Sequence, residues 1–460
     1  MQTALDEQRL LLVVFQLQLL HWQFAMITAM LFANPGYRKI LGRPWVKGEP
    51  FLPTVQRMMT DDPKQFYRHF RMRPPTFRFL EQQLWEHVTD ADREKRAAKL
   101  PKERGGRQRS RSIFERQLLM TIWFLAKGCT LLDCGTQWGY PQLDRRDLLI
   151  DEIASMFSIF VRWPTGADFW KVCTMFSELL SRNSDQQNGF WRCCGAIDGS
   201  YIKILRPIAG TPDAGQSFNT HKCFHAIQLL AICSPDYVIR YAHIGMPGSY
   251  ADITILKLCA FYIGVHAFIP AGSGAYLLGD GGFELFTWLM IPFASMAYER
   301  VRGRYAAHQR RAMNMYDSAQ KSARVVVEQT FGILKGRWRC LHLGLHCDNE
   351  NSTNMVMACI VLHNICLLPT IKDFWDHVYA EDDKVTDPDI GFRVPAWLHP
   401  TARDPAYEDP YPDPATRERY KKDAVARREE IMRGLAPALY AAHEEQVELD
   451  KAEAHRLHQQ

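Results

Sequence analysis

The sequence predicts an α/β fold, with a mixed β-sheet flanked by helices and an all-helical region before it. Apolar residues recur at helical spacing through much of the first 190 residues. From residue 193 short strand-like runs appear first and then alternate with helices. This order of elements is typical of a mixed sheet packed between helices.

Length and charge narrow the class of protein. The chain has 460 residues, of which 47% are hydrophobic, so it is neither a mini-protein nor a disordered chain. The net charge is +5, but nine Lys or Arg and two Glu give residues 93–111 a charge of +7, which leaves −2 elsewhere. This segment, the basic strip, contains the DNA-contact candidates Arg104, Arg107 and Arg109. It could be a nuclear-import signal or bind phosphates, and a solvated loop is the alternative.

The cysteines and the N-terminus bear on location. Twelve cysteines show no CxxC pair, which favours reduced thiols in the nucleus or cytoplasm. Cys359, His363 and Cys366 share one helix face and could suggest zinc, but a core helix is favoured. Residues 10–32 are long and apolar enough to span a bilayer. Interrupting glutamines favour a buried or partner-packing helix instead of a membrane span.

Helical patterns fill the region before the sheet. Asp62 and Pro63 predict a helix start, and residues 76–85 place Phe77, Leu80 and Leu84 on one face. Helices are then expected over 113–127, 130–137 and 142–157. Their spacing resembles a helix-turn-helix, with Arg145 and Arg146 as DNA-contact candidates near the start of the third helix. An ordinary helical scaffold is the alternative.

The second half is expected to form the sheet. Strands are predicted at 193–197, 201–205, 224–233, 237–244 and 275–278, with helices at 252–265 and 317–338. Residues 415–435 and 436–458 are expected to be solvated helices. The predicted regions are 1–92 (helical), 93–112 (basic linker), 113–190 (helix-turn-helix-like), 191–370 (core) and 371–460 (charged tail).

Three acidic residues have unusual surroundings. Asp198 and Asp280 each follow a short apolar run and precede glycine, so they are expected at the ends of buried strands. A carboxylate buried there is costly unless it is paired or binds metal. Glu328 lies within a predicted helix. Carboxylates from two strands and a helix suit Mg²⁺, and two such ions can activate water and stabilise a leaving oxygen. Taken singly, each acid could instead cap a turn or form an ion pair.

Basic residues share the predicted helix face with Glu328. At about 100° per residue, Lys321, Arg324 and Lys335 lie on its side of the helix. These cations are candidates for holding a nucleic-acid backbone. The alternative is that Arg324 simply pairs with Glu328.

Several motifs resemble the PIF/Harbinger family of DDE transposases, which includes domesticated Harbinger-derived nucleases. In order along the chain they are GAIDGS (195–200), MPGS (246–249), LGDGGF (278–283), ARVVVEQTFGILKGRW (323–338) and LHN (362–364). The resemblance covers about residues 60–370, and the glutamate motif is the most specific. It implies an RNase H-like core and DNA cleavage dependent on Mg²⁺ or Mn²⁺. The implied catalytic and metal-binding triad is Asp198, Asp280 and Glu328.

The second motif region departs from the family. The proline-glycine-serine motif usually ends in His-Asp, whereas this chain has Ala251 and Asp252. Asp252 is therefore a fourth candidate metal ligand, and a helix N-cap is its alternative role.

The predicted function is a metal-dependent DNA endonuclease or transposase that uses a two-metal DDE mechanism. The alternative is a domesticated DNA- or chromatin-binding adaptor without catalysis. DNA is the expected partner, and transposases of this kind often rely on a separate Myb-like DNA-binding protein. A homo-oligomer is left open by the sequence, and the nucleus is the expected location.

Overall fold

The computed structural model describes residues 51–89, 109–140, 142–181, 190, 192–207, 217–293, 305–368, 414–436, 440, 441 and 444. The apolar segment 10–32 and the candidates Arg104 and Arg107 lie outside these ranges. Arg109 is the first residue of a helix, but the structure does not describe its side chain. Within the ranges, no helix is long and apolar enough to cross a membrane.

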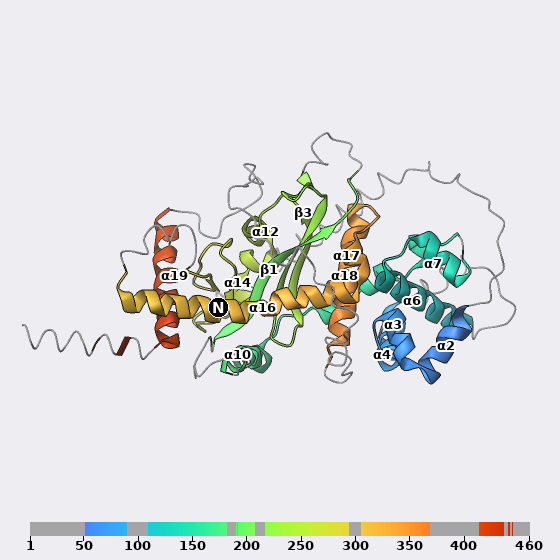
Figure 1. Ribbon diagram of the computed structural model, residues 1–460, viewed down its shortest axis with the longest axis horizontal. Coiled ribbons are helices and arrows are strands. Elements are labelled where there is room, and N and C mark those ends of the chain that lie inside the picture. Colours follow the sequence, from blue (N-terminus) through green and yellow to red (C-terminus); the bar gives the residue numbers. More distant parts are fainter. Residues whose placement is uncertain are drawn as a thin grey trace, which may run out of the picture.

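The core is a five-stranded mixed sheet (Figure 1). Its strands, in the order in which they lie side by side, are β3 (Ile239–Pro247), β2 (Ala226–Cys233), β1 (Cys193–Lys203), β4 (Tyr276–Leu278) and β5 (Leu289–Met290). β1, β2 and β3 pair antiparallel, whereas β4 pairs parallel with β1 and with β5. The predicted α/β class with a mixed sheet is therefore confirmed.

Two details of the predicted sheet were wrong. Residues 193–197 and 201–205 belong largely to one strand, because Asp198 pairs with Ala231 and Ser200 with Leu229 in β2. Asp198 thus lies in the middle of a strand, not at its end. The two-residue strand β5 was not predicted, because so short a run leaves no periodic signal.

Helices cover both faces of the sheet. The long helix α16 (Ala307–Arg337) crosses one face, and its residues Val327 and Phe331 share a core with Ala196 and Ile202 of β1 (Figure 1). The other face, which Ile197 enters by strand alternation, is covered by α12, α13 and α14. These three helices span Asp252–Leu258, Ala260–Ile263 and Val265–Phe268.

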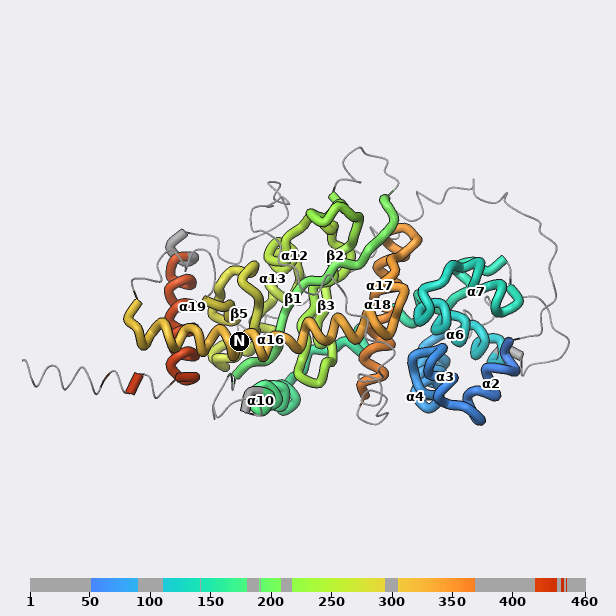
Figure 2. The backbone as a smooth tube through the Cα atoms, viewed as in Figure 1, coloured from blue at the N-terminus to red at the C-terminus, as the bar shows by residue number. Residues whose placement is uncertain are grey.

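The bounds of these helices correct two predictions. The single helix expected over 252–265 is interrupted at Cys259, which is buried and has extended backbone (φ −87°, ψ 155°). Helix α16 begins ten residues before the predicted start at residue 317 and is one continuous helix (Figure 2).

α10 (Gly166–Ser181) lies beside β1.

The N-terminal helices form a separate layer at one end of the molecule (Figure 1). They are α2 (Phe51–Asp61), α3 (Pro63–Phe70), α4 (Pro74–His87), α6 (Arg109–Lys127) and α7 (Leu131–Trp138). As predicted, Asp62 caps α3 by accepting a hydrogen bond from the Gln65 N–H, and Phe77, Leu80 and Leu84 are buried.

The third helix of the predicted helix-turn-helix was wrong. Residues 142–157 contain a 3₁₀ turn, η2 (Arg145–Asp147), and the short helix α8 (Ile150–Ser155), followed by α9 (Phe157–Phe160). Asp144 caps η2, and Leu148 then returns to extended backbone, so the helix cannot continue. A helix-turn-helix is therefore not confirmed.

Helix α18 (Asn349–Cys366) joins the helical region to the sheet, after the short helix α17 (Arg339–Leu343). The Asn364 amide donates to the carbonyls of Phe160 and Ile239 and accepts from the Ile239 N–H. His363 Nε2 lies 3.0 Å from the Tyr237 carbonyl oxygen. The zinc alternative gains no support, because the described residues contain no group of three suitable ligands arranged for a metal.

The C-terminal helix α19 (Pro414–Leu435) is not the solvated helix that the sequence predicted. Met432 and Leu435 are buried, and the Arg428 guanidinium lies 3.8 Å from the centre of the Phe293 ring. Figure 1 shows α19 crossing the N-terminal part of α16. Its charged residues conceal a narrow apolar stripe, which is why composition alone suggested full exposure.

Buried His363 predicts a pH dependence of stability. Burial lowers the pKa of His363 to about 4, below the unfolded value near 6.5. Between these values only the unfolded chain takes up the proton, so stability falls as the pH falls, by on the order of 3 kcal/mol in total. We expect His363→Gln to remove this component from urea unfolding curves measured at about pH 7 and about pH 4.5. Exposed His266→Gln is the matched control, and equal acid sensitivity of all three proteins would contradict the prediction.

Candidate active site

The sheet brings the two predicted aspartates to the same level on neighbouring strands. β1 and β4 run parallel, and Ala196 pairs with Leu278. Asp198 and Asp280 each follow that pair by two residues. Because strand residues advance in step, the two carboxylates are placed side by side at this point of the sheet.

Glu328, on α16, is connected to Asp198 through Arg324 of the same helix. The Arg324 guanidinium donates to Asp198 Oδ2 over 2.8 Å and pairs with Glu328 Oε1 at 2.6 Å. The side chains of Arg324, Asp198 and Glu328 are only 12%, 17% and 28% exposed, respectively. Arg324 therefore links the strand and helix acids within a largely desolvated site, where such charge-assisted bonds are strong.

Gln320 is a structural residue of the site that the sequence reasoning missed. Its side chain is buried and donates to the Gly279 carbonyl over 2.6 Å, next to Asp280. This bond fixes α16 against the end of β4. Gln320, Arg324 and Glu328 are spaced four residues apart, so one helix face carries all three. This four-residue spacing was the sequence feature that could have identified Gln320 as part of the site.

Asp252 approaches β1 from the opposite face of the sheet. It is the first residue of α12, whose N-cap is Ala251, so the alternative N-cap role for Asp252 is wrong. Its carboxylate packs on Gly199, where an added Cβ would lie 2.0 Å from Asp252 Oδ1. Glycine is thus required next to Asp198 so that Asp252 can come close.

The acids perturb one another. Burial raises the pKa of Asp198 to about 7, and the charges of Asp280 and Glu328 add to this, while Arg324 opposes it. Burial also raises the pKa of Asp252 well above its usual value, with further contributions from Asp198 and Asp280. When they ionise, these acids carry more negative charge than one guanidinium neutralises, so an additional cation would favour their ionised forms.

The donor chemistry fits a hard divalent ion. Asp198, Asp280, Glu328 and Asp252 offer carboxylate oxygens, which Mg²⁺ and Mn²⁺ prefer. Among the described residues, no three such side chains are already arranged around a metal position. Arg324 instead occupies oxygens of Asp198 and Glu328. The argument for a divalent ion therefore depends on two observations. The four side chains are carboxylates, and when ionised they outnumber the one guanidinium in the site.

The predicted frame of three cations around Glu328 is only partly present. Lys321 is exposed, whereas Arg324 lies inside the acidic site. Lys335 is buried, and its ammonium donates to the Tyr201 carbonyl over 3.0 Å. Burial argues against the predicted DNA contact of Lys335, because a lysine tied to the β1 backbone cannot reach a phosphate.

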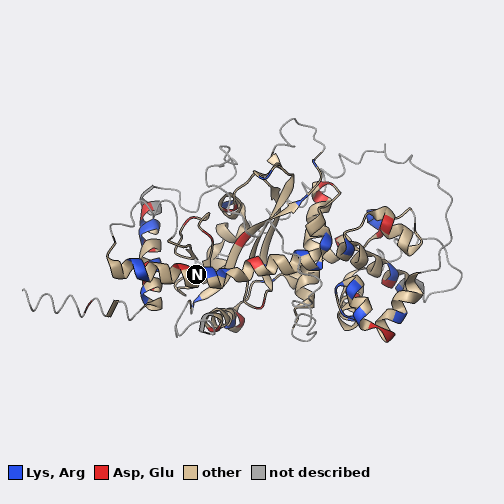
Figure 3. Ribbon diagram, in the orientation of Figure 1, with Lys and Arg blue, Asp and Glu red and all other residues tan. Residues whose placement is uncertain are grey.

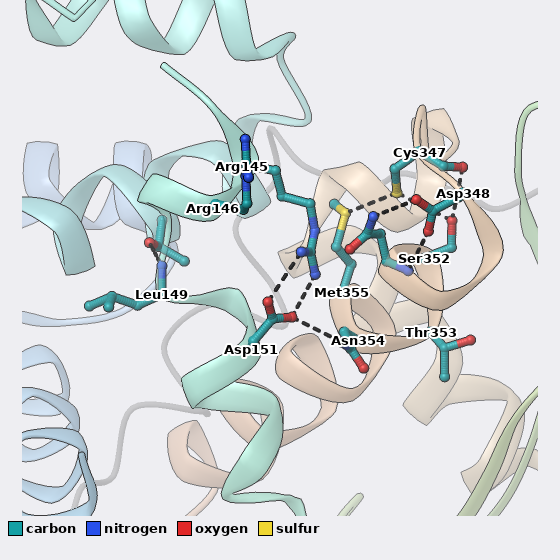
Figure 4. A network of polar contacts seen from close by, with 12 residues as sticks. Arg145, Arg146, Leu149, Asp151, Cys347, Asp348, Ser352, Thr353, Asn354 and Met355 are labelled. Atoms are coloured by element: carbon teal, nitrogen blue, oxygen red, sulfur yellow. Dashed lines mark hydrogen bonds and ion pairs between the residues drawn. The ribbon is translucent and has the colours of Figure 1, made fainter. Parts of the chain in front are cut away.

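The two arginines of η2 have different surroundings. Arg145 pairs with Asp151, which also accepts a hydrogen bond from Asn354 of α18 (Figure 4). Arg146 pairs with Asp144, but its side chain is 71% exposed. Asp151 therefore connects Arg145 of η2 to α18, and of the two arginines only Arg146 presents its charge to solvent. Figure 3 shows other Lys and Arg on the N-terminal helices, α16 and α19, with acidic residues among them.

Comparison with known proteins identifies relatives of the sheet region. Residues 197–364 match the family described as DDE superfamily endonuclease. The putative nuclease HARBI1 of Homo sapiens is 27% identical over 271 residues, which cover 56% of this chain and 69% of that protein. The protein ALP1-like of Arabidopsis thaliana is 25% identical over 244 residues, or 50% of this chain and 53% of that protein.

A second Arabidopsis thaliana relative is the protein named antagonist of like heterochromatin protein 1. It is 23% identical over 270 residues, covering 55% of this chain and 62% of the relative. No solved structure matches the chain significantly. The matches confirm the resemblance that the motifs predicted, because the chain has a DDE superfamily endonuclease domain and is homologous to HARBI1 and ALP1-like proteins.

The contact between Gly199 and Asp252 can be tested by a double-mutant cycle. We expect Gly199→Ala to lower the free energy of unfolding by about 1–3 kcal/mol, because the new methyl group collides with the carboxylate. In an Asp252→Ala background most of this cost should disappear. Urea unfolding measures each value.

Gly281→Ala is the matched control, since its added Cβ would meet its nearest atom, Pro292 Cγ, at 3.9 Å. A cost for Gly199→Ala that is unchanged without Asp252 would show that the contact is not responsible.

Proposed function

Because this chain carries a DDE superfamily endonuclease domain and is homologous to Harbinger-derived DDE nucleases, we propose that it is a divalent-metal-dependent DNA endonuclease. The observation that carries the proposal is the convergence of Asp198, Asp280 and Glu328 on one part of the sheet. An RNase H-like core is part of the proposal. The strand order β3-β2-β1-β4-β5, with acids on the central strand and after its parallel neighbour, supports it.

Each acid has a defined role in the proposed mechanism. Asp198, Asp280 and Glu328 would hold the divalent ions, and Asp252 is a fourth candidate from the other face. Such ions, when bound, would supply a nucleophilic water and stabilise the leaving oxygen of the phosphodiester. Gln320 keeps α16 against the end of β4, so that Glu328 and Asp280 stay in reach of one another. Lys321, about one helical turn before Arg324, is exposed, which supports a proposed role in holding a DNA phosphate.

DNA and the nucleus remain proposals for the whole chain. Lys321 and Arg146 are the described candidates for phosphate contact, and the basic strip is the candidate for nuclear import. A Myb-like partner protein and self-association stay predictions from the sequence.

The second candidate function is a DNA- or chromatin-binding adaptor without catalysis. The observation that favours it is Arg324, which already compensates Asp198 and Glu328 without a metal ion. Against it, an adaptor has no need for four partly buried acids, among which burial and neighbouring charges raise the pKa values of Asp198 and Asp252. Nicking of supercoiled plasmid DNA in Mg²⁺ or Mn²⁺ separates the two functions.

Substitution of the triad tests the endonuclease. We expect Asp198→Asn, Asp280→Asn and Glu328→Gln each to reduce metal-dependent nicking at least about hundredfold, since changes merely behind metal ligands already cost about 10–100-fold. The exposed Glu284, which pairs with Lys257, gives the matched control Glu284→Gln. Wild-type nicking by any folded triad variant would refute that residue's role.

Arg324 is expected to compete with added metal for the acids. Arg324→Met should lower the free energy of unfolding by about 3 kcal/mol, because it leaves buried carboxylates without their partner. Added Mn²⁺ should then raise the melting temperature of the variant more than that of wild type, because bound ligand stabilises the folded state.

The control for Arg324→Met is Arg240→Met, which breaks the 2.8 Å ion pair with Asp236 outside the site. If Mn²⁺ stabilises wild type, Arg324→Met and Arg240→Met equally, Arg324 does not occupy a position that the metal needs.

A further inference from the structure

A small pocket lies beside the acidic site, on the side of the sheet that α12 covers. It has a cavity volume of about 140 Å³. Its lining includes Tyr201 of β1, Asn219 and His221 from the segment before β2, and Ser249, Tyr250 and Ala251 between β3 and α12. None of these six residues has a role in the mechanism proposed above.

The pocket and the acidic site are formed in part by the same two segments, β1 and the start of α12. Tyr201 lies two residues after Gly199 and points to the same face of β1 by strand alternation. Asp252 packs on Gly199 and directly follows Ala251. Burial, reinforced by the charge of Asp252, raises the pKa of Tyr201 to about 12. A group bound in the pocket would therefore lie next to the carboxylates.

Backbone contacts preform the pocket. The Gly248 N–H donates to the Ala226 carbonyl over 2.9 Å, and the Ser249 N–H donates to the Ser217 carbonyl over 3.1 Å. At Gly248 an added Cβ would lie only 2.7 Å from the Ala226 oxygen, so glycine permits this close approach. Gly248 and Ser249 of the motif at 246–249 thus form part of the pocket lining, a role that the sequence alone did not suggest.

The lining chemistry suits a nucleobase. The Tyr201 ring lies 5.8 Å from the His221 ring, and its hydroxyl is 3.4 Å from His221 Nδ1. The amide of Asn219 can both donate and accept hydrogen bonds at a base edge. Lys222 Nζ lies 5.9 Å from the centre of the Tyr201 ring, which places positive charge for a phosphate nearby. Aromatic rings with adjacent cations are the usual means of binding an unpaired nucleotide.

The size of the pocket limits the ligand. Sites for whole drug-sized molecules measure roughly 300–1,000 Å³, so about 140 Å³ accommodates only one flat group of a larger ligand. Ala251 leaves this part of the lining open, because its side chain is a single methyl group.

We propose that this pocket binds one unpaired nucleobase of the DNA, adjacent to the phosphodiester that the acidic site cleaves. The inference rests on the proposed endonuclease function and adds how the DNA is positioned. A base held outside the duplex would fix the strand relative to Asp198 and Asp280, as enzymes that bind extrahelical bases do in snug pockets.

Photocrosslinking tests the base-binding pocket without cleavage. The probe is a short single-stranded oligonucleotide of mixed sequence that carries 5-iododeoxyuridine, mixed with the full chain in EDTA. We expect crosslinks at Tyr201 or Tyr250, located by mass spectrometry of the peptides. Ala251→Leu, which fills the pocket, should reduce their yield about tenfold, the loss expected for one base–aromatic stack. Ala267→Leu makes the same change at an exposed position and should leave the yield unchanged.

A second variant protects the test against misfolding. Tyr201→Leu removes the aromatic ring but keeps an apolar side chain, and it should also reduce the crosslink at Tyr250 about tenfold. Thermal unfolding verifies that each variant is folded. The inference is overturned if the oligonucleotide does not bind, if crosslinks map only to other regions, or if both folded variants crosslink as wild type does.

Plasmid nicking by the same preparations separates this inference from the proposed function. Nicking without a crosslink in the pocket overturns base binding and leaves the endonuclease intact. A crosslink in the pocket without any nicking supports base binding and counts against the endonuclease.

Discussion

The pairing of Arg324 with both Asp198 and Glu328 is the interaction on which the candidate site depends. It joins the central strand to α16, and it supplies positive charge where several carboxylates are withdrawn from water. Without a cation, like charges at this spacing would push protons onto the acids or push the helix away from the sheet. The same geometry favours binding of a divalent ion, because the single positive charge of Arg324 does not neutralise four ionised carboxylates.

The scaffold around this interaction consists of close backbone approaches. Gly199 admits Asp252, Gly248 admits the segment before β2, and Gln320 ties α16 to the carbonyl of Gly279. At the β3 edge of the sheet, Asn364 of α18 joins β3 to α9. A small change at any of these contacts moves an element rather than one side chain, because close-packed interiors transmit displacement.

The structure also separates cations that are buried in contacts within the fold from cations whose side chains are exposed. Arg145 and Lys335 are used inside the protein, since Arg145 pairs with Asp151 of α8 and Lys335 donates to the β1 backbone. Lys321 and Arg146 present their charge to solvent. A sequence shows only that such residues share a helix face or follow a turn. Whether a cation is already paired with a carbonyl or a carboxylate from another segment depends on how the segments pack.

The sequence by itself determined the α/β class, the caps and buried faces of the first helices, the β2–β3 hairpin and the family motifs with their three acids. These features depend on local periodicity, turn chemistry and short motifs. Only the tertiary structure decided that Asp198 lies within a strand, that residues 142–157 are not one helix and that α19 packs on α16. It also placed Asp252 on the opposite face from Arg324 and set Ala251 beside Tyr201. Such outcomes depend on contacts between segments far apart in the chain, and no local pattern encodes them.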